Sequence, residues 1–204
     1  ELTSADQGML SEASHRLSQA QLWAEGILLE RRLEHGQPAN IRRRFYPHQW
    51  LIELRPVLES LAAQHRVQLV WGGWDRSLPR LYLDPTHLSR VVLNLVTNAL
   101  VASQPESRVE IKVAWLTNVT QHLQITVEDK GEGLPAEMMR QVNASQLWPT
   151  EDHAVNAGGL GLRTVKALTR ALGGEFSAQL IPAGGTQFCL RLPVDNYHSL
   201  IRGW

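Results

Sequence analysis

The chain has 204 residues, 43% of them hydrophobic, and its 20 basic side chains balance 20 acidic ones. This length suggests one or two domains with enough apolar content for a buried core. Zero net charge argues against a nucleic-acid partner, and a single cysteine excludes a disulfide framework and favours a reducing, cytoplasmic compartment. Because the chain begins at Glu1, we expect a piece of a longer protein, whose attachment to a membrane stays open.

The first segment has the pattern of a helix that packs against another helix. Its apolar residues alternate between spacings of three and four, a heptad seam formed by Leu10, Ala13, Leu17, Ala20, Ala24 and Ile27. Gly36 ends the helix and Pro38 prevents its continuation. The seam predicts either a dimerisation helix or a helix that packs on its own domain.

The next segments predict a helix and two strands. The basic run at 42–44 is interpreted as the solvated edge of a linker. Residues 51–63 have helical spacing, and 67–71 and 78–83 form two strands around the turn Gly72-Gly73.

Residues 84–103 predict an amphipathic helix with two asparagines on one edge. Asp84 supplies N-cap chemistry and Pro85 suits the first helical position. Asn94 and Asn98 lie four residues apart, so their carboxamides point the same way. His87 is interpreted as a surface capping residue. Taken alone, the asparagine pair is more typical of a solvated surface than of a ligand site. The apolar stripe consists of Leu88, Val91, Val92, Leu95, Val96, Ala99 and Leu100.

Three glycine motifs follow the asparagines. Strands predicted at 109–115 and 123–127 lead into a turn with Asp129, Gly131 and Gly133, and strands at 176–180 and 187–192 flank a Gly184-Gly185-Thr186 hairpin turn. Between them, a cluster opens a helix that runs to Leu172; its members are Gly158, Gly159, Leu160, Gly161 and Leu162. Strands packed on helices in this order predict an α/β (α+β) fold, a two-layer sandwich of a mixed sheet packed on helices.

In this order, the asparagine pair, the two glycine clusters and the terminal Gly-Thr resemble the boxes of a shared ATP-binding domain. The proteins that contain this domain are bacterial sensor histidine kinases, type II topoisomerases, heat-shock chaperones of the same superfamily and MutL. The resemblance covers residues 67–194 and is specific because four motifs occur together. It implies the Bergerat-type fold preceded by a helical segment. The implied domains are the end of a dimerisation and phosphotransfer helix (1–38), a connector with a short helix (39–66) and the catalytic ATP-binding domain (67–204).

The resemblance also implies roles for the site residues. Asn98 would coordinate Mg²⁺ on the phosphates of ATP, and Asn94 is the candidate catalytic residue that completes this polar edge. Asp129 would accept a hydrogen bond from the adenine amino group, with support from Thr186 through water. Gly131 and Gly133 would let the backbone approach the nucleotide, and phosphate oxygens would meet the start of the following helix at Gly159, Leu160, Gly161 and Leu162.

Asn94 helps to choose among these relatives, because the others carry a glutamate there that activates water, and an amide is a poor general base. We therefore expect a histidine kinase that transfers the γ-phosphoryl group of Mg-ATP to a histidine outside this fragment, for relay to the receiver domain of a response regulator. The full-length protein would be a homodimer that supplies its own upstream dimerisation helix and acceptor histidine. The alternatives are a non-catalytic interaction module that keeps the fold and an anti-sigma-type serine kinase.

Four features depart from the family pattern. His15 is followed by Arg16, and Ala20 stands where the proline after a phosphoacceptor is expected, so His15 is interpreted as a surface residue. Val101 stands where family members often carry a lysine or arginine. Ala157 stands where they carry the first glycine of the second glycine box. The phenylalanine-rich lid motif is absent, and we expect residues 137–157, with Trp148 as a substitute lid aromatic, to form a mobile lid.

Overall fold

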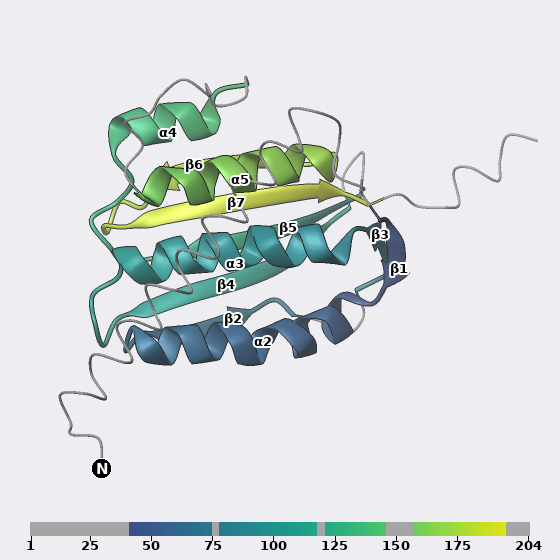
Figure 1. Ribbon diagram of the computed structural model, residues 1–204, viewed down its shortest axis with the longest axis horizontal. Coiled ribbons are helices and arrows are strands. Elements are labelled where there is room, and N and C mark those ends of the chain that lie inside the picture. The colour runs from purple at the N-terminus through teal and green to yellow at the C-terminus, as the bar shows by residue number, and fades with distance from the viewer. Residues whose placement is uncertain (1–40, 75–77, 118–120, 146–156, 195–204) are drawn as a thin grey trace, which may run out of the picture. The chain divides into compact units, whose positions relative to one another are not determined.

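The computed structural model describes residues 41–74, 78–117, 121–145 and 157–194, with the backbone alone for 157–160. The helix expected at 10–27, His15 and Trp148 lie outside the described residues, and the domain divisions after 38 and 66 stay predictions. Along the chain the elements are β1 (Arg43–Phe45), α2 (Pro47–Gln64), β2 (Gln68–Gly72), β3 (Leu81–Leu83), α3 (Pro85–Ala102), β4 (Arg108–Leu116), β5 (His122–Glu128), α4 (Ala136–Asn143), α5 (Ala157–Ala171), β6 (Glu175–Leu180) and β7 (Thr186–Pro193) (Figure 1).

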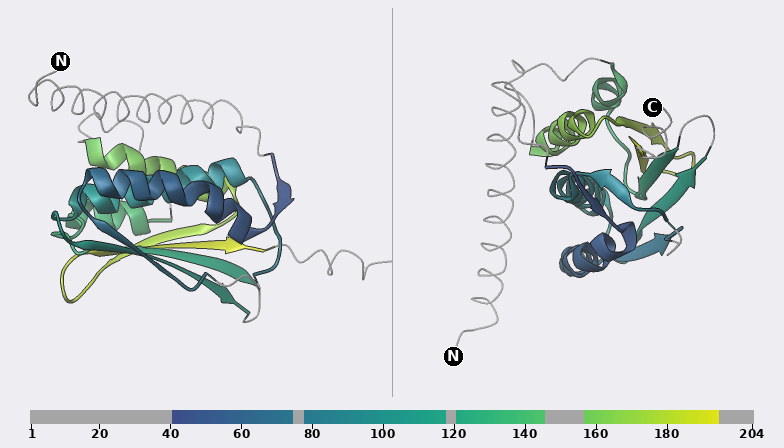
Figure 2. Two further views of the ribbon diagram at one scale, coloured as in Figure 1. Left: turned by 90° about the horizontal axis from the view of Figure 1, so that it is seen from below. Right: turned by 90° about the vertical axis from the view of Figure 1, so that its right-hand side faces the viewer.

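The main sheet has five strands in the order β2-β4-β5-β7-β6, and β1 pairs with β3 in a separate two-stranded sheet. The pair β2-β4 is parallel, whereas β4-β5, β5-β7 and β6-β7 are antiparallel. Helices α2, α3 and α5 lie side by side on one face of the main sheet, and none of the described helices covers the other face (Figure 2). The structure confirms the predicted two-layer α/β sandwich with a mixed sheet.

The core lies between α3, α5 and the covered face of the sheet. Strand β4 alternates because successive side chains point to opposite faces: Val109, Ile111 and Val113 are buried, whereas Glu110 and Lys112 lie on the open face, where the Lys112 ammonium is 3.1 Å from the Glu110 carboxylate. Helix α3 meets this apolar surface with the stripe predicted from the sequence, since all seven of its residues are buried. Within the described residues, no helix is long and apolar enough to cross a bilayer.

Two sequence predictions need correction, one for the strands around Gly72-Gly73 and one for the run at 42–44. The segments at 67–71 and 78–83 contain strands, as expected, but β2 pairs with β4 and β3 pairs with β1. Gly73 explains the difference, because its φ is +71° and a Cβ there would lie 2.0 Å from the Val113 carbonyl oxygen on β4. The chain is therefore still in close contact with β4 where it leaves β2. The run at 42–44, interpreted as a linker edge, has exposed side chains but enters strand β1.

Helix α2 is held against α3 by its apolar side and one polar contact. Pro47 stands at its N-terminus, where the missing N–H needs no partner. Trp50, Leu54 and Leu58 are buried, and the Trp50 indole N–H donates to Ser89 Oγ on α3 at 2.7 Å. This contact helps to fix the position of the helix that carries Asn94 and Asn98.

The segment expected to form a lid begins with a helix. Residues 136–143 form α4, which buries Val142 and contacts α5 and β6. The Asn143 amide donates to the Ala178 carbonyl oxygen at 2.9 Å and accepts from the Ala178 N–H at 3.0 Å, so it pairs with the edge of β6 as a neighbouring strand would. The beginning of the expected lid is therefore anchored to the sheet.

Candidate functional site

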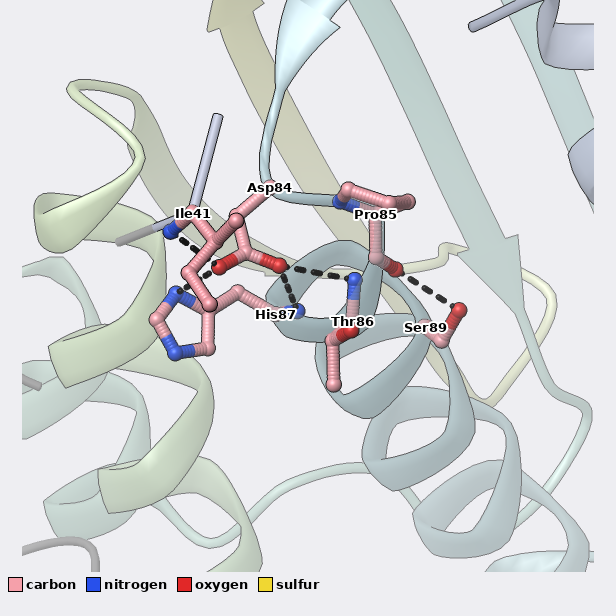
Figure 3. Close-up of polar contacts among 6 residues, drawn as sticks. All are labelled: Ile41, Asp84, Pro85, Thr86, His87 and Ser89. Atoms are coloured by element: carbon pink, nitrogen blue, oxygen red, sulfur yellow. Dashed lines mark hydrogen bonds and ion pairs between the residues drawn. The ribbon is translucent and has the colours of Figure 1, made fainter. Parts of the chain in front are cut away.

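Helix α3 starts at a cap that fixes where its asparagines lie. Asp84 Oδ1 accepts hydrogen bonds from the backbone N–H groups of Thr86 at 2.9 Å and His87 at 3.2 Å, which is the predicted N-cap (Figure 3). Asp84 Oδ2 accepts a third bond, from the Ile41 N–H at 2.8 Å. Because Ile41 precedes β1, the Asp84 carboxylate links the backbone just before β1 to the start of α3.

His87 is buried, with 6% of its surface exposed, so the interpretation as a surface residue was wrong. Its Nδ1 lies 3.6 Å from Asp84 Oδ2 but has no hydrogen-bond partner in the described chain. Burial lowers the pKa of His87, and the charge of Arg90 lowers it further, against the opposing effect of Asp84. A spacing signal was present in the sequence, since His87, Val91 and Leu95 lie four residues apart on the buried stripe.

The asparagines face the first turns of α5. Asn94 Nδ2 donates to the Arg90 carbonyl oxygen at 2.9 Å, which fixes its amide. A Cβ built on Gly161 would lie 3.2 Å from both amide atoms of Asn98 and 3.5 Å from Asn94 Oδ1. The glycine therefore allows a close approach of α5 to the two amides on α3, and the approach brings two of the predicted motifs together.

The donor set at this edge fits a magnesium ion that is shared with phosphate oxygens. Asn98 Nδ2 is buried and lacks a hydrogen-bond partner within the described chain, as expected for an amide whose polar atoms serve a ligand. Amide oxygens are hard ligands, and Mg²⁺ commonly completes its shell with waters and substrate phosphates. The described residues contain no group of three or more His, Cys, Asp or Glu that could hold a metal by themselves. The asparagine oxygens are therefore the protein ligands that this edge offers.

The second cluster surrounds Asp129, which is 1% exposed. Its Oδ1 accepts bonds from the N–H groups of Gly131 at 2.9 Å and Thr186 at 3.2 Å, and its own N–H donates to the Thr186 carbonyl oxygen at 3.0 Å. Burial raises the pKa of Asp129, although these two N–H groups act to lower it. No described group donates to Oδ2, which leaves this oxygen as the acceptor for a ligand.

The glycines around Asp129 hold backbone segments together. A Cβ on Gly131 would lie 2.2 Å from the Ala102 carbonyl oxygen at the end of α3, and one on Gly185 would lie 2.1 Å from the Asp129 carbonyl oxygen. Gly133 and Gly185 have φ values of +89° and +99°, which favour glycine. This close packing was not anticipated: the glycines were expected to serve ligand approach, and Thr186 to act through water rather than by direct backbone bonds.

Helix α5 begins earlier than expected, at Ala157, so Gly159, Leu160 and Gly161 lie in its first turns. The N–H groups of a helix's first turn have no acceptor within the helix. Gly159 and Leu160 fall in this turn, so their N–H groups are the ones available to an anion. Leu162 is 1% exposed, and its side chain belongs to the core.

Comparison with known proteins agrees with this arrangement. The family model described as histidine kinase-, DNA gyrase B-, and HSP90-like ATPase matches residues 83–196. The adaptive-response sensory kinase SasA of a Nostoc species is 31% identical over 63% of this chain and 32% of its own length. The signal transduction histidine-protein kinase/phosphatase MprB of a Mycobacterium species is 34% identical over 59% of this chain and 23% of its own length. The chain thus spans a third or less of these relatives.

Solved structures share the fold. Full-length ShkA in complex with AMPPNP aligns with a TM-score of 0.68 and 19% identity, over 95% of this chain and 40% of that one. The mycobacterial sensor histidine kinase MprB aligns with a TM-score of 0.58 and 22% identity, over 76% of this chain and 98% of that one. Because the family model matches more than half of its residues, the chain belongs to the family of histidine kinase-, DNA gyrase B- and HSP90-like ATPases, and it is an ATPase domain of the histidine kinase type.

Proposed function

We propose that this chain is the catalytic domain of a two-component sensor histidine kinase, which transfers the γ-phosphoryl group of Mg-ATP to a histidine outside this fragment, for relay to a response regulator. The observation that carries this proposal is the packing of Asn94 and Asn98 against Gly161, because it joins the two motifs that would hold the phosphates. The names of the relatives, a sensory kinase and a histidine-protein kinase, support the same class.

Asp129 would select the base. Its Oδ1 is occupied by two backbone N–H groups, so Oδ2 accepts a hydrogen bond from the amino group of adenine. Guanine carries a carbonyl oxygen at the equivalent position, and two acceptors facing each other in a buried site are unfavourable. This carboxylate therefore favours ATP over GTP.

The phosphates would lie between α3 and the start of α5. The N–H groups of Gly159 and Leu160 bind phosphate oxygens there, and the oxygens of Asn94 and Asn98 hold the metal. Mg²⁺, when bound, neutralises negative charge on the transferred group. The Asn94 amide positions this edge and takes up no proton near neutral pH, so water is not activated for hydrolysis by this residue. Val101, which is 60% exposed, leaves the phosphates without the cation common at its position.

The acceptor histidine and the response regulator would be supplied from outside this fragment. We assign 1–38 to the end of the dimerisation helix and 39–66 to the connector, with the full-length protein as a homodimer. Phosphoryl transfer requires the acceptor nitrogen in line with the γ-phosphate. We therefore expect that this chain binds ATP but does not phosphorylate itself, although it contains eight histidines.

The test is a transfer experiment in trans. The chain is incubated with γ-labelled Mg-ATP, with and without a separately expressed helix pair of the full-length parent that carries the acceptor. Acid-labile label on the helix pair alone is the expected result, and Asn98→Ala is the control that should lose it. Acid-stable label would indicate a serine kinase, and bound ATP without any transfer would indicate the non-catalytic module. Label on His15 would make the first segment the acceptor helix.

A further inference from the structure

A cavity separate from the proposed nucleotide site lies between α4, the second half of α5 and the start of β6, which are neighbours at one edge of the fold (Figure 1). Its volume of about 450 Å³ is in the range of small-molecule sites. None of the residues assigned above to ATP or Mg²⁺ lines it. Its lining includes three cationic side chains, Lys166, Arg170 and Arg191, and one carboxylate, Glu175.

Lys166 is the unusual member of this group, because only 5% of its surface is exposed. Its ammonium donates to the Gln141 carbonyl oxygen near the end of α4 and makes no ion pair with any carboxylate of the described chain. An ammonium has three donors, and a buried charge without a counter-charge is costly. Burial and the neighbouring Arg170 both lower the pKa of Lys166, as expected for a cation that lacks an anionic partner.

Two further groups with unused donors line the same space, Arg170 and Thr169. The Arg170 guanidinium donates to the Ser145 carbonyl oxygen, which uses one of its five N–H groups. Arg191 is not one of these donors, because its Nε donates to Gln124 on β5, on the side of β7 away from β6. Thr169 is 1% exposed, and its hydroxyl has no hydrogen-bond partner within the described chain. A buried hydroxyl without a partner is uncommon and indicates a missing ligand or water.

A purely structural role accounts for part of this arrangement. Lys166 and Arg170 tie α5 to carbonyl oxygens at the end of α4, and each uses a single donor to do so. This role explains neither the cavity nor the unpartnered Thr169 hydroxyl. It also leaves the positive charge of Lys166 without a counter-charge among the described residues.

We propose that this cavity binds a small phosphate-bearing anion, held by Lys166, Arg170 and the Thr169 hydroxyl. A phosphate group offers several strong acceptors and a charge near −2, which suits convergent Lys, Arg and hydroxyl donors. The bound anion bridges α4 to α5, and so stabilises the helix that opens the expected lid segment. This inference does not depend on the proposed transfer reaction.

The test is a titration of the ¹⁵N-labelled chain with inorganic phosphate at constant ionic strength, followed by amide chemical shifts. Saturable shifts are expected at Ser145, Thr169 and Ser177, with the same apparent affinity in Asn98→Ala, which alters the nucleotide site only. Glycerol phosphate should give the same shifts, whereas acetate should give weaker ones. Arg170→Gln should weaken phosphate about tenfold, as loss of a hydrogen bond to a charged group predicts.

Lys166→Gln should weaken phosphate further, but its side chain is buried and the variant can lose its fold. Arg170 is exposed, so Arg170→Gln decides the question if Lys166→Gln is unfolded. The proposal is overturned by shifts confined to the start of α5, by shifts that grow linearly without saturation, by equal responses to acetate and phosphate, or by unchanged affinity in Arg170→Gln.

Discussion

Asp129 combines two tasks in one carboxylate. Oδ1 satisfies the N–H groups of Gly131 and Thr186, whereas Oδ2 is the oxygen that we propose accepts from adenine. Removal of the whole side chain would leave both N–H groups unpaired, at a cost of about 1–3 kcal/mol for each buried group. Asp129→Ala therefore mixes a loss of stability with a loss of binding, and the isosteric Asp129→Asn is the sharper variant.

Asp129→Asn should bind ATP at least tenfold more weakly and lose the preference for ATP over GTP. The asparagine oxygen can still accept from the two N–H groups, but its NH₂ then meets the amino group of adenine, donor against donor, and can donate to the guanine carbonyl oxygen. Calorimetry with ATP and GTP on the folded variant measures both effects. Equal affinity of the unmodified chain for the two nucleotides would rule out the role given to Asp129.

His87 should make stability depend on pH. The unfolded chain takes up a proton at the ordinary histidine pKa of 6.5, whereas in the folded protein burial lowers the pKa of His87. Unfolding therefore takes up a proton below this pH, and the free energy of unfolding should fall as the pH drops through 6.5, until the lowered pKa is passed.

Urea denaturation of the unmodified chain and of His87→Gln at about pH 7.5, 6.5 and 5.5 measures this dependence. The difference in unfolding free energy between the two proteins should shift in favour of the variant as the pH falls. Asp129, whose raised pKa acts in the opposite direction, is common to both proteins and cancels in the difference. Parallel pH profiles would show that His87 does not titrate differently in the folded state.

At the scale of elements, the contact between α3 and α5 is the feature on which the proposed phosphate site depends. Gly161→Ala adds a Cβ at 3.2 Å from the Asn98 amide, which is tighter than an ordinary van der Waals contact. In a helix, alanine is favoured over glycine by about 1 kcal/mol. We expect the variant to keep or gain stability while its affinity for Mg-ATP falls, measured by thermal unfolding and calorimetry on the same samples.

The double variant Gly161→Ala/Asn98→Ala provides the control for this contact. If the Cβ acts by crowding the amide, its effect on binding should shrink once the amide is gone, because residues in contact are not additive. Additive losses would mean that Gly161 acts on the nucleotide independently of Asn98.

The elements that the sequence predicted best are those with a long periodic pattern. The stripe of α3 and the alternation of β4 and β7 each extend over several side chains, so the period was readable. Strand β1 has three residues and pairs with β3, some forty positions away, which leaves no local pattern to read. Helix α4 buries a single residue, Val142, among the described positions, so it lacks the stripe that marks a helix.

The candidate site likewise has features that the sequence predicted and features that it did not. The resemblance assigned Asn98 and Gly161 to the same phosphates, and the structure brings these two residues close together, although their roles stay predictions. The direct backbone bonds between Asp129 and Thr186 were not predictable, because they depend on the register between β5 and β7. The pocket around Lys166 was not predictable either, because the residues that line it come from four elements with no shared motif.

For the whole molecule, the layers explain where chemistry can occur. The five-stranded sheet presents its covered face to three helices, and the site residues lie on α3, on the start of α5 and on the turns that leave β5 and precede β7. In the proposed function, two helices and two glycine turns would thus surround the nucleotide, while the acceptor would come from outside this fragment. The arrangement suits a domain that positions ATP for delivery, since phosphoryl transfer requires mainly positioning and charge neutralisation.

The most direct test of this account is calorimetry of Mg-ATP and metal-free adenosine binding to the unmodified chain and to Asn98→Ala. We expect the unmodified chain to bind Mg-ATP with a Kd of about 10–100 μM, or roughly 5.5–7 kcal/mol. Asn98→Ala should weaken Mg-ATP at least tenfold and leave adenosine unchanged, because in the proposed site the amide would hold the metal and Asp129 the base. Equal losses for both ligands, or no Mg-ATP binding by the unmodified chain, would contradict the assignment of this pocket.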